Sequence, residues 1–510
     1  MFVRVHSFSL EGIEAVPVAV EVDVSPGLPC FDIVGLPDAA VRESRERVRA
    51  AIRNGGWAFP AQRITVNLAP AHTRKGGAGF DLAIALGVLA AGGHLPACAP
   101  GEVAVAGELA LDGTLRPVRG TLAMGLAALA GGGRALLVPA ANAAEAALGG
   151  GVVYGAGDLA GVVGHLTGKA PLDRAAPVRS GAGEPDRGLP DLADVKGQLI
   201  ARRALEVAAA GGHNLLMVGP PGAGKSLLAR CLPSILPPLE HDEALEVSRI
   251  HSVAGLLTDA RLLTTRPFRS PHHCASRSAI LGGGSPLRPG EMTLAHRGVL
   301  FLDELPEFAR PVLEGLRQPL EEGRVLLSRA NASAAFPARP MLVAASNPCP
   351  CGYLGDPARA CTCPQQTVVQ YRARLSGPLI DRFDMQVWLE PVPYDQVAAA
   401  GARPHQNGPE PSAVVRRRVE AARRRQHKRL QGSASACNAH LTPAEVRRFC
   451  RLPEGGEGLM RQAMERMGLS LRAHDRILKM ARTIADLAGS DVIELPHLAE
   501  ALQYRGLDRR

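Results

Sequence analysis

Hydrophobic and polar positions change their pattern twice along the chain. In the first third, partly alternating apolar stretches at 16–24 and 64–67 predict strands, and the stretches 39–54 and 81–91 predict helices. From about residue 191, apolar stretches such as 215–218 predict buried strands that alternate with helices. Beyond residue 411 the periodicity is helical. We therefore predict an α/β protein whose last part is helical.

Two segments without apolar periodicity separate these parts. One, rich in Pro, Gly and Arg, covers 169–190, and the other covers 398–411. We predict a first domain over 1–168, a linker over 169–190, a second domain over 191–395 and a helical part over 396–510. A chain of 510 residues is too long for a single core and is compatible with this division.

A glycine-rich loop follows the predicted strand at 215–218. It consists of Gly219, Pro220, Pro221, Gly222, Ala223, Gly224, Lys225 and Ser226, and a helical stretch follows. This pattern between strand and helix is typical of a phosphate-binding loop, because glycines let successive N–H groups turn towards phosphate. Further on, the apolar strand 299–302 ends in Asp303 and Glu304. A glycine-rich turn beside a buried acidic strand end is the alternative, but the two motifs in this order favour a nucleoside triphosphate.

These motifs divide the predicted chemistry among five side chains. Lys225 is expected to reach the β- and γ-phosphates, and Ser226 and Asp303 are expected to hold Mg²⁺. Glu304 is left to activate the attacking water. Asn347 ends another apolar strand, where its amide can position that water or merely begin a turn.

Two segments exceed a minimal nucleotide-binding fold. The stretch 251–297 contains the adjacent residues His272 and His273. Because neighbouring side chains diverge on regular backbone, a structural role or nucleic-acid contact is favoured over a metal site. Residues 323–337 predict a β-hairpin on which Arg324 and Arg329 are available to line a channel, and a purely structural hairpin is an equal alternative.

Charge is concentrated in one predicted helix. Of the formal net charge of +9, the segment 411–432 carries most, with eight Lys or Arg against one acid. Such a helix favours a polyanion, and the candidate DNA contacts are Arg416, Arg417, Arg423, Arg424 and Lys428. A solvated helix, or one paired with acids of a neighbouring subunit, is the alternative. With no signal-peptide pattern and no apolar run of bilayer length, we expect a soluble, cytoplasmic protein without membrane contact.

Four of the ten cysteines lie in one short segment. They are Cys349, Cys351, Cys361 and Cys363. In a reducing cytosol this spacing favours a structural tetrahedral zinc site over two disulfides, with uncoordinated or redox-active thiols as the alternative.

Longer motifs of high specificity accompany these features. They read IVGLPDAAVRES at 33–44, VNLAPA at 66–71, SPHH at 270–273, LRQPLE at 316–321 and NPCPCG at 347–352. Through them the chain resembles, nearly from end to end, the AAA+ ATPases of the magnesium-chelatase-related group, and specifically the ComM/YifB family.

The resemblance implies a fold and a function. The fold is α/β: an AAA+ P-loop parallel-sheet core with a helical C-terminal lid and an N-terminal Lon-protease-like (S5-like) α+β domain. The function is that of a homohexameric helicase that uses ATP and Mg²⁺ for branch migration of DNA in homologous recombination or natural transformation. Arg382 would be the arginine finger that acts on a neighbouring subunit, and Arg472 would be the sensor arginine.

Two further expectations concern activity. A Lon-type protease needs a nucleophilic Ser and an activating Lys, but the turn at 75–81 contains no Ser and the segment 117–121 contains no Lys, so proteolysis is not expected. A chelatase-like factor that remodels a protein partner or inserts a metal is the alternative to the DNA motor.

Overall fold

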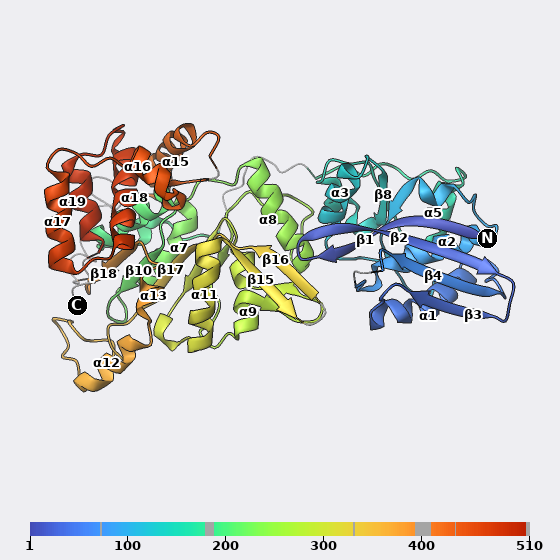
Figure 1. Cartoon of the computed structure of the whole chain (residues 1–510), viewed down its shortest axis with the longest axis horizontal. Helices are drawn as coiled ribbons and strands as arrows, with labels where there is room; N and C mark the ends of the chain where they lie inside the picture. The colour runs from blue at the N-terminus through green and yellow to red at the C-terminus, as the bar shows by residue number, and fades with distance from the viewer. Residues whose placement is uncertain (72–73, 179–187, 330–331, 393–409, 434, 506–510) are drawn as a thin grey trace.

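The N-terminal part of the protein is built around a seven-stranded sheet (Figure 1). The structure is a computed structural model, which describes residues 1–71, 74–178, 188–329, 332–392, 410–433 and 435–505. The strand order of the sheet is β3-β4-β2-β1-β5-β8-β9. Strand β2 is antiparallel to both of its neighbours, β1 and β4, and the remaining neighbouring pairs are parallel. The strands are β1 (Phe2–Glu11), β2 (Glu14–Ser25), β3 (Cys30–Val34), β4 (Arg63–Ala69), β5 (Val103–Val105), β8 (Ala135–Pro139) and β9 (Val153–Ala156).

Five helices accompany this sheet. They are α1 (Ala39–Asn54), α2 (Asp81–Ala91), α3 (Thr121–Ala130), α4 (Ala140–Ala147) and α5 (Leu159–Leu166). Every residue of α2 is buried, because this helix is apolar on all sides and packs against the β1–β2 hairpin. Its first residue, Asp81, is paired with Arg47 of α1 at 2.6 Å. The strands predicted at 16–24 and 64–67 and the helices predicted at 39–54 and 81–91 are confirmed.

The second unit is built on a five-stranded parallel sheet of order β11-β14-β17-β10-β18. Its strands are β10 (Leu215–Val218), β11 (Phe268–Arg269), β14 (Val299–Leu302), β17 (Met341–Ser346) and β18 (Met385–Trp388). Along β17, Val343 and Ala345 belong to one hydrophobic core, whereas Leu342 and Ala344 belong to another on the opposite face. Helices cover both faces, as a buried parallel sheet requires. They include α6 (Leu199–Gly211), α7 (Lys225–Ile235), α8 (His241–Ala254) and α11 (Arg310–Glu322).

Two segments are inserted between strands of this sheet along the chain. The first contains α9 (Arg277–Leu281), the small hairpin of β12 (Gly282–Gly283) and β13 (Arg288–Pro289), and α10 (Glu291–Leu294). The second is the hairpin of β15 (Arg324–Arg329) and β16 (Ala332–Pro337). The predicted hairpin at 323–337 is therefore confirmed.

The C-terminal helices share a core with the second unit (Figure 1). They are α15 (Ser412–Arg429), α16 (Pro443–Phe449), α17 (Gly456–Met467), α18 (Leu471–Ala488) and α19 (Leu495–Gln503). Val415 and Val419 of α15 lie in one cluster with Leu205 of α6 and Ile477 of α18. The described helices between residues 412 and 503 thus continue the packing of the five-stranded sheet. Among the described helices, none combines the length and the apolar character that crossing a bilayer demands.

The two units meet where the tip of the β1–β2 hairpin reaches α8 and β16 (Figure 1). Ile13, at the hairpin tip, is buried in one core cluster with Ile250 and Phe336. Glu14 pairs with Arg249 at 3.0 Å. The N-terminal hairpin is thus anchored beside the second inserted hairpin.

Candidate functional site

The predicted phosphate-binding loop, residues 219–226, lies between β10 and α7, at the carboxyl edge of the parallel sheet, where ligands of open α/β sheets bind. Gly222 and Gly224 have left-handed φ values of 81° and 85°, a conformation that L side chains rarely adopt. A Cβ on Gly219 would lie 2.6 Å from the carbonyl oxygen of Leu389. Glycine is therefore required at these three positions for conformation or close packing.

Lys225 and Asn347 are brought together because β10 and β17 are neighbours. Lys225 Nζ donates to Asn347 Oδ1 at 3.0 Å and to the carbonyl oxygens of Gly219 and Pro220 at 2.6 and 2.8 Å. Burial lowers the pKa of Lys225 to about 8, against the attraction of Asp303 and Glu304. The amine is thus held among oxygen acceptors, an arrangement that phosphate oxygens can also supply.

Ser226 and Asp303 meet across the same edge. Ser226 Oγ donates to Asp303 Oδ2 at 2.6 Å. A hydroxyl and a carboxylate from neighbouring elements are the oxygen ligands that Mg²⁺ prefers, so these residues fit a magnesium ion bound with nucleotide.

Glu304 follows Asp303 in a left-handed backbone conformation, with a φ of 52°. Its side chain is 52% exposed, and Oε2 lies 3.2 Å from Nδ1 of His273. Sequence reasoning did not find this pairing. The spacing of 31 positions carries no periodic signal, and the two side chains meet because β11 and β14, which they follow, are neighbouring parallel strands.

Arg382 is buried and paired within its own chain. Its guanidinium contacts Glu321 of α11 and donates to the carbonyl oxygen of Pro378 at 3.2 Å. Arg472 lies exposed in the first turn of α18, where Ser470 caps the helix by accepting from the N–H of Ala473. The roles predicted for the two arginines stay predictions.

The four cysteines form a compact cluster directly after Asn347. Sγ of Cys349 lies 3.4 Å from that of Cys351 and 3.6 Å from that of Cys361, and the ligand atoms of all four, with Cys363, lie within 4.8 Å of one another. Zinc–sulfur bonds of about 2.3 Å in a tetrahedron place sulfurs roughly 3.8 Å apart, so the cluster fits a structural zinc ion.

The cysteine cluster also packs on the phosphate-binding loop. Gly352 has a left-handed φ of 86°, and a Cβ there would lie 2.6 Å from Cδ of Pro221. The cluster therefore supports the loop from the side of β17.

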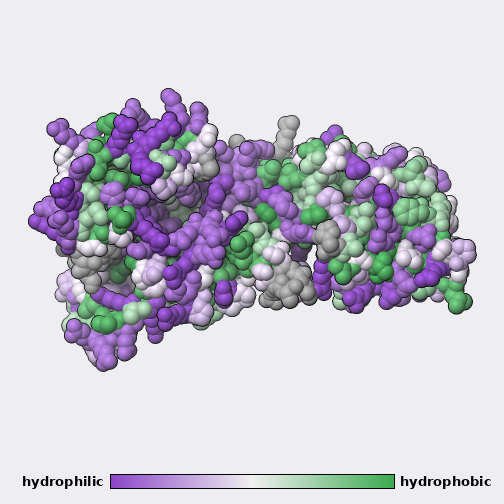
Figure 2. Space-filling model, viewed as in Figure 1, coloured by the Kyte–Doolittle hydropathy of each residue, from purple (hydrophilic) through white to green (hydrophobic). Residues whose placement is uncertain are grey.

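The basic residues of α15 divide into two groups. Arg418 pairs with Glu206 at 2.5 Å, and Arg423 donates to the carbonyl oxygen of Ala209 at 3.0 Å. Arg417, Arg424 and Lys428 are exposed, and Arg416 is half-buried. Figure 2 shows hydrophilic side chains gathered over these C-terminal helices. Arg423, predicted to contact DNA, is thus engaged in packing α15 on α6.

The second inserted hairpin carries Arg324 and Arg329, the two arginines that the sequence made available to line a channel. Arg324 is exposed, with Nε 3.5 Å from a carboxylate oxygen of Glu322. The side chain of Arg329 lies outside the described part of the structure.

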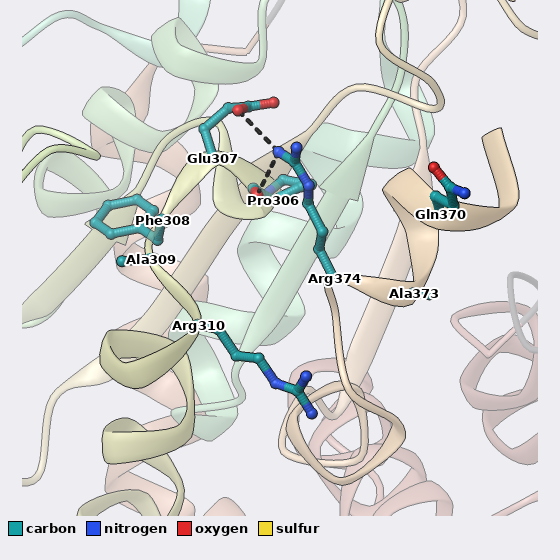
Figure 3. A pocket seen from close by; sticks show the side chains of 8 residues that line it. All are labelled: Pro306, Glu307, Phe308, Ala309, Arg310, Gln370, Ala373 and Arg374. Atoms are coloured by element: carbon teal, nitrogen blue, oxygen red, sulfur yellow. Dashed lines mark hydrogen bonds and ion pairs between the residues drawn. The ribbon is translucent and has the colours of Figure 1, made fainter. Parts of the chain in front are cut away.

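An open cavity of about 470 Å³ lies beside the segment that follows Glu304 (Figure 3). Its lining residues are Pro306, Glu307, Phe308, Ala309, Arg310, Gln370, Ala373 and Arg374. The helix α12 (Gln365–Ala373) forms one wall. Arg374, just beyond α12, pairs with Glu307 at 3.0 Å and so ties this wall to the end of the acidic strand.

Gln198 is a second residue that sequence reasoning missed. It adopts a left-handed conformation at the start of α6, and its amide donates to the carbonyl oxygens of Ala223 and Glu390 at 3.1 and 2.6 Å. It thereby anchors the phosphate-binding loop to the segment after β18.

Three family models match successive parts of the chain. Residues 191–397 match the family model for magnesium chelatase, subunit ChlI; residues 20–142 match that for subunit ChlI of Mg-chelatase; and residues 409–505 match that for the ChlI C-terminal part.

Relatives extend the similarity over the full length. The chain is 45% identical to the uncharacterized protein YifB of Escherichia coli and 45% identical to the competence protein ComM of Haemophilus influenzae, in each case over 99% of this chain and 97% of the relative. It is also 28% identical to the DNA replication licensing factor Mcm3 of Drosophila melanogaster, over 27% of this chain and 14% of that protein.

Proposed function

Because this chain belongs to the ComM/YifB family of magnesium-chelatase-related AAA+ proteins, we propose that it is an ATP-hydrolysing, ring-forming motor that drives branch migration of DNA. The observation that carries the proposal is the convergence of Lys225, Ser226, Asp303, Glu304 and Asn347 at one sheet edge. The competence name of ComM and the DNA replication name of Mcm3 support DNA as the substrate.

The chain's own residues divide the work of hydrolysis. Lys225 would exchange its carbonyl acceptors for phosphate oxygens and neutralise their charge. Ser226 and Asp303 would hold Mg²⁺, which when bound screens the phosphate charge. Glu304 would accept the proton of the attacking water, and Asn347, hydrogen-bonded to Lys225, would orient that water.

A stripe of cations on α15 offers a contact for the phosphate backbone. Arg417, Arg424 and Lys428 are exposed. At about 100° per residue they lie within roughly 40° of one another around the helix. Three cations in one stripe would release counterions from DNA and bind it independently of sequence.

The decisive experiment measures ATP turnover and the movement of a synthetic Holliday junction by the full-length protein and by Lys225→Ala. We expect the wild type to hydrolyse ATP faster with the junction and to move it, and the variant to do neither. Turnover that does not respond to DNA, with no junction movement by the wild type, would instead favour a chelatase-like factor acting on a protein or a metal.

A triple variant tests the DNA surface. Replacing Arg417, Arg424 and Lys428 with Ala should weaken DNA binding and reduce its salt dependence by about one unit of slope per residue, while turnover without DNA stays unchanged. The matched control removes three exposed arginines from the N-terminal helix α1, namely Arg42, Arg45 and Arg53. Equal losses in both triple variants would show that net charge acts, and not the stripe.

A further inference from the structure

We propose that the four-cysteine cluster and the phosphate-binding loop are thermodynamically linked sites, so that a zinc ion held by the cysteines tightens the binding of ATP. The inference rests on the proposed function, because ATP is the nucleotide in that assignment. Its starting point is the place where the two sites touch, since a Cβ on Gly352 would lie 2.6 Å from Cδ of Pro221. The backbone of the cysteine-bearing segment therefore lies directly against the loop that would hold the phosphates.

Gly352 belongs to a tight turn that the cysteines themselves form. Its N–H donates to the carbonyl oxygen of Cys349 at 3.0 Å, and the N–H of Cys351 donates to Sγ of Cys363 at 3.4 Å. The left-handed φ of 86° and the approach to Pro221 leave no room for a side chain at this position. The place of the turn, and with it the support of Pro221, therefore depends on how firmly the sulfurs are held together.

Asn347 connects the cluster to the lysine of the nucleotide site. It lies two residues before Cys349, whose side chain is fully buried. Its Oδ1 accepts from Lys225 Nζ at 3.0 Å, and its carbonyl oxygen accepts from the hydroxyl of Ser346 at 2.9 Å. Because only Pro348 separates Asn347 from Cys349, a shift of the buried cysteine would move the amide that holds Lys225.

The same segment reaches the strand on the other side of the loop. A Cβ on Gly355 would lie 3.3 Å from Cζ2 of Trp388, the last residue of β18. Strands β17 and β18 flank β10, from which the phosphate-binding loop emerges. The segment that begins at Asn347 thus bridges the two neighbours of β10 and rests on the loop that follows it.

The sulfurs determine how firmly this segment is held. Sγ of Cys351 lies 3.4 Å from that of Cys349 and 3.6 Å from that of Cys361. Thiols make only weak hydrogen bonds, and thiolates this close would repel one another. Four thiolates that share one zinc ion would instead fix the segment. The metal-bound chain should then hold Pro221 and Asn347 in a single arrangement, so less of the binding energy of ATP would be lost in ordering them.

Linkage requires the effect to be reciprocal. If zinc tightens the binding of ATP by some factor, ATP tightens the binding of zinc by the same factor. Coupling between two sites of one protein commonly amounts to about five- to 150-fold. Since the two sites are joined by one packing contact at Pro221 and one hydrogen bond at Asn347, we expect the lower end of this range, about five- to tenfold.

The first test measures both directions with the full-length protein. The Kd of a fluorescent, non-hydrolysable ATP analogue in excess Mg²⁺ should rise about five- to tenfold when a zinc-selective chelator removes zinc, and should recover when zinc is added back. The affinity for zinc, measured by competition with a zinc-binding dye, should rise by the same factor when the analogue is saturating. Lys225→Ala should bind the analogue poorly, so its affinity for zinc should not respond to the analogue.

A substitution tests the contact without changing a cysteine. Gly352→Ala should keep its zinc but raise KM for ATP about five- to tenfold with kcat changed less than twofold, because it weakens the ground state and the transition state alike. A mere loss of folded protein would lower kcat and leave KM unchanged. The matched control is Gly56→Ala, since Gly56 has a nearly equal φ of 88° but, among the described residues, no atom that its added Cβ would meet within 4 Å. It should match the wild type in both constants.

The outcomes decide between the ideas. An analogue Kd that is the same with and without zinc, in a protein that keeps its far-UV circular dichroism, would overturn the linkage, and so would a wild type purified without zinc. If Gly352→Ala does not fold, removal and return of zinc in the wild type carry the same test. A wild type that links zinc to the analogue but neither responds to DNA nor moves a junction would support the linkage and refute the DNA motor, so the two failures are distinguishable.

Discussion

Asp384 ties helix α18 to the start of β18, and Asp384→Asn removes its charge while keeping its shape. The carboxylate accepts from the N–H of Asn214 at 3.0 Å and lies 3.3 Å from Nε of Arg476 on α18. Nδ1 of the fully buried His213 lies 3.7 Å away. Burial alone would raise the pKa of Asp384, but His213 and Arg476 hold it at about 2.

The size of the effect follows from this pKa. Lowering it from 3.8 to about 2, at ~1.36 kcal/mol per pH unit, corresponds to about 2 kcal/mol of folding free energy at neutral pH. Only 13% of the side chain is exposed, so little of this is lost to solvent screening. Asp384→Asn should therefore lower the melting temperature of the second unit by roughly 4–8 °C.

The pH dependence has a definite sign. A carboxylate whose pKa is lowered by folding stabilises the native state above its unfolded pKa of 3.8, and it loses this contribution as pH falls towards 2. The difference in stability between wild type and Asp384→Asn should be constant from pH 7 to about 5 and should shrink below pH 4. Thermal unfolding of both proteins across this range measures it.

A neighbouring carboxylate and a double-mutant cycle complete the test. Asp381→Asn, the same change three residues earlier, should lower the melting temperature far less than Asp384→Asn. Combining Asp384→Asn with Arg476→Met should destabilise the protein less than the sum of the single changes, by about 1–3 kcal/mol. Strict additivity, or an Asp384→Asn protein that melts within 2 °C of the wild type, would refute the reasoning.

Three further predictions concern the nucleotide and metal sites. Glu304→Gln should retain ATP binding and ring assembly but lose turnover by at least about a hundredfold, and near-normal hydrolysis would reassign the base. Purified protein should contain one zinc per chain by metal analysis, and Cys361→Ser should lose most of it; a zinc-free wild type would exclude the site. Mixing Lys225→Ala with Arg382→Ala subunits should restore part of the turnover that each lacks alone, because a mixed interface combines an intact loop with an intact finger; no recovery would argue against action in trans.

The sequence predicted well which residues meet at the carboxyl edge of the second sheet, because the carboxyl ends of parallel strands lie at the same edge. Strands β14 and β17 are short runs of mainly apolar residues followed by Asp303 and Asn347, and β10 is followed by the glycine-rich loop; parallel strands bring such ends together. The predicted strands at 215–218 and 299–302 therefore carried Ser226 and Asp303 to within 2.6 Å of each other. The phosphate-binding loop needed no tertiary information beyond that.

Side-chain pairing between distant segments lay beyond this reasoning. The basic helix α15 shows the limit most clearly, because its charge predicted one exposed surface. In the structure Arg418, Arg425 and Arg429 pair with Glu206, Asp491 and Asp486, at 2.5, 3.2 and 2.6 Å. The sequence shows the number of cations, but which of them the acids of α6 and the C-terminal segment neutralise depends on the packing of helices far apart along the chain.

Arg382, the predicted arginine finger, pairs with Glu321 within its own chain, and the pairing constrains how it can act. Its side chain is 8% exposed and contacts Glu321, which is 50% exposed and ends the LRQPLE motif. A finger that serves a neighbouring subunit must leave this carboxylate, whereas a buried guanidinium without a partner is costly. Release is therefore favourable only when a neighbour's phosphates replace Glu321. Under the proposed function, the intrachain pair would keep Arg382 withdrawn in an isolated subunit and would make its use as a finger depend on contact within a ring.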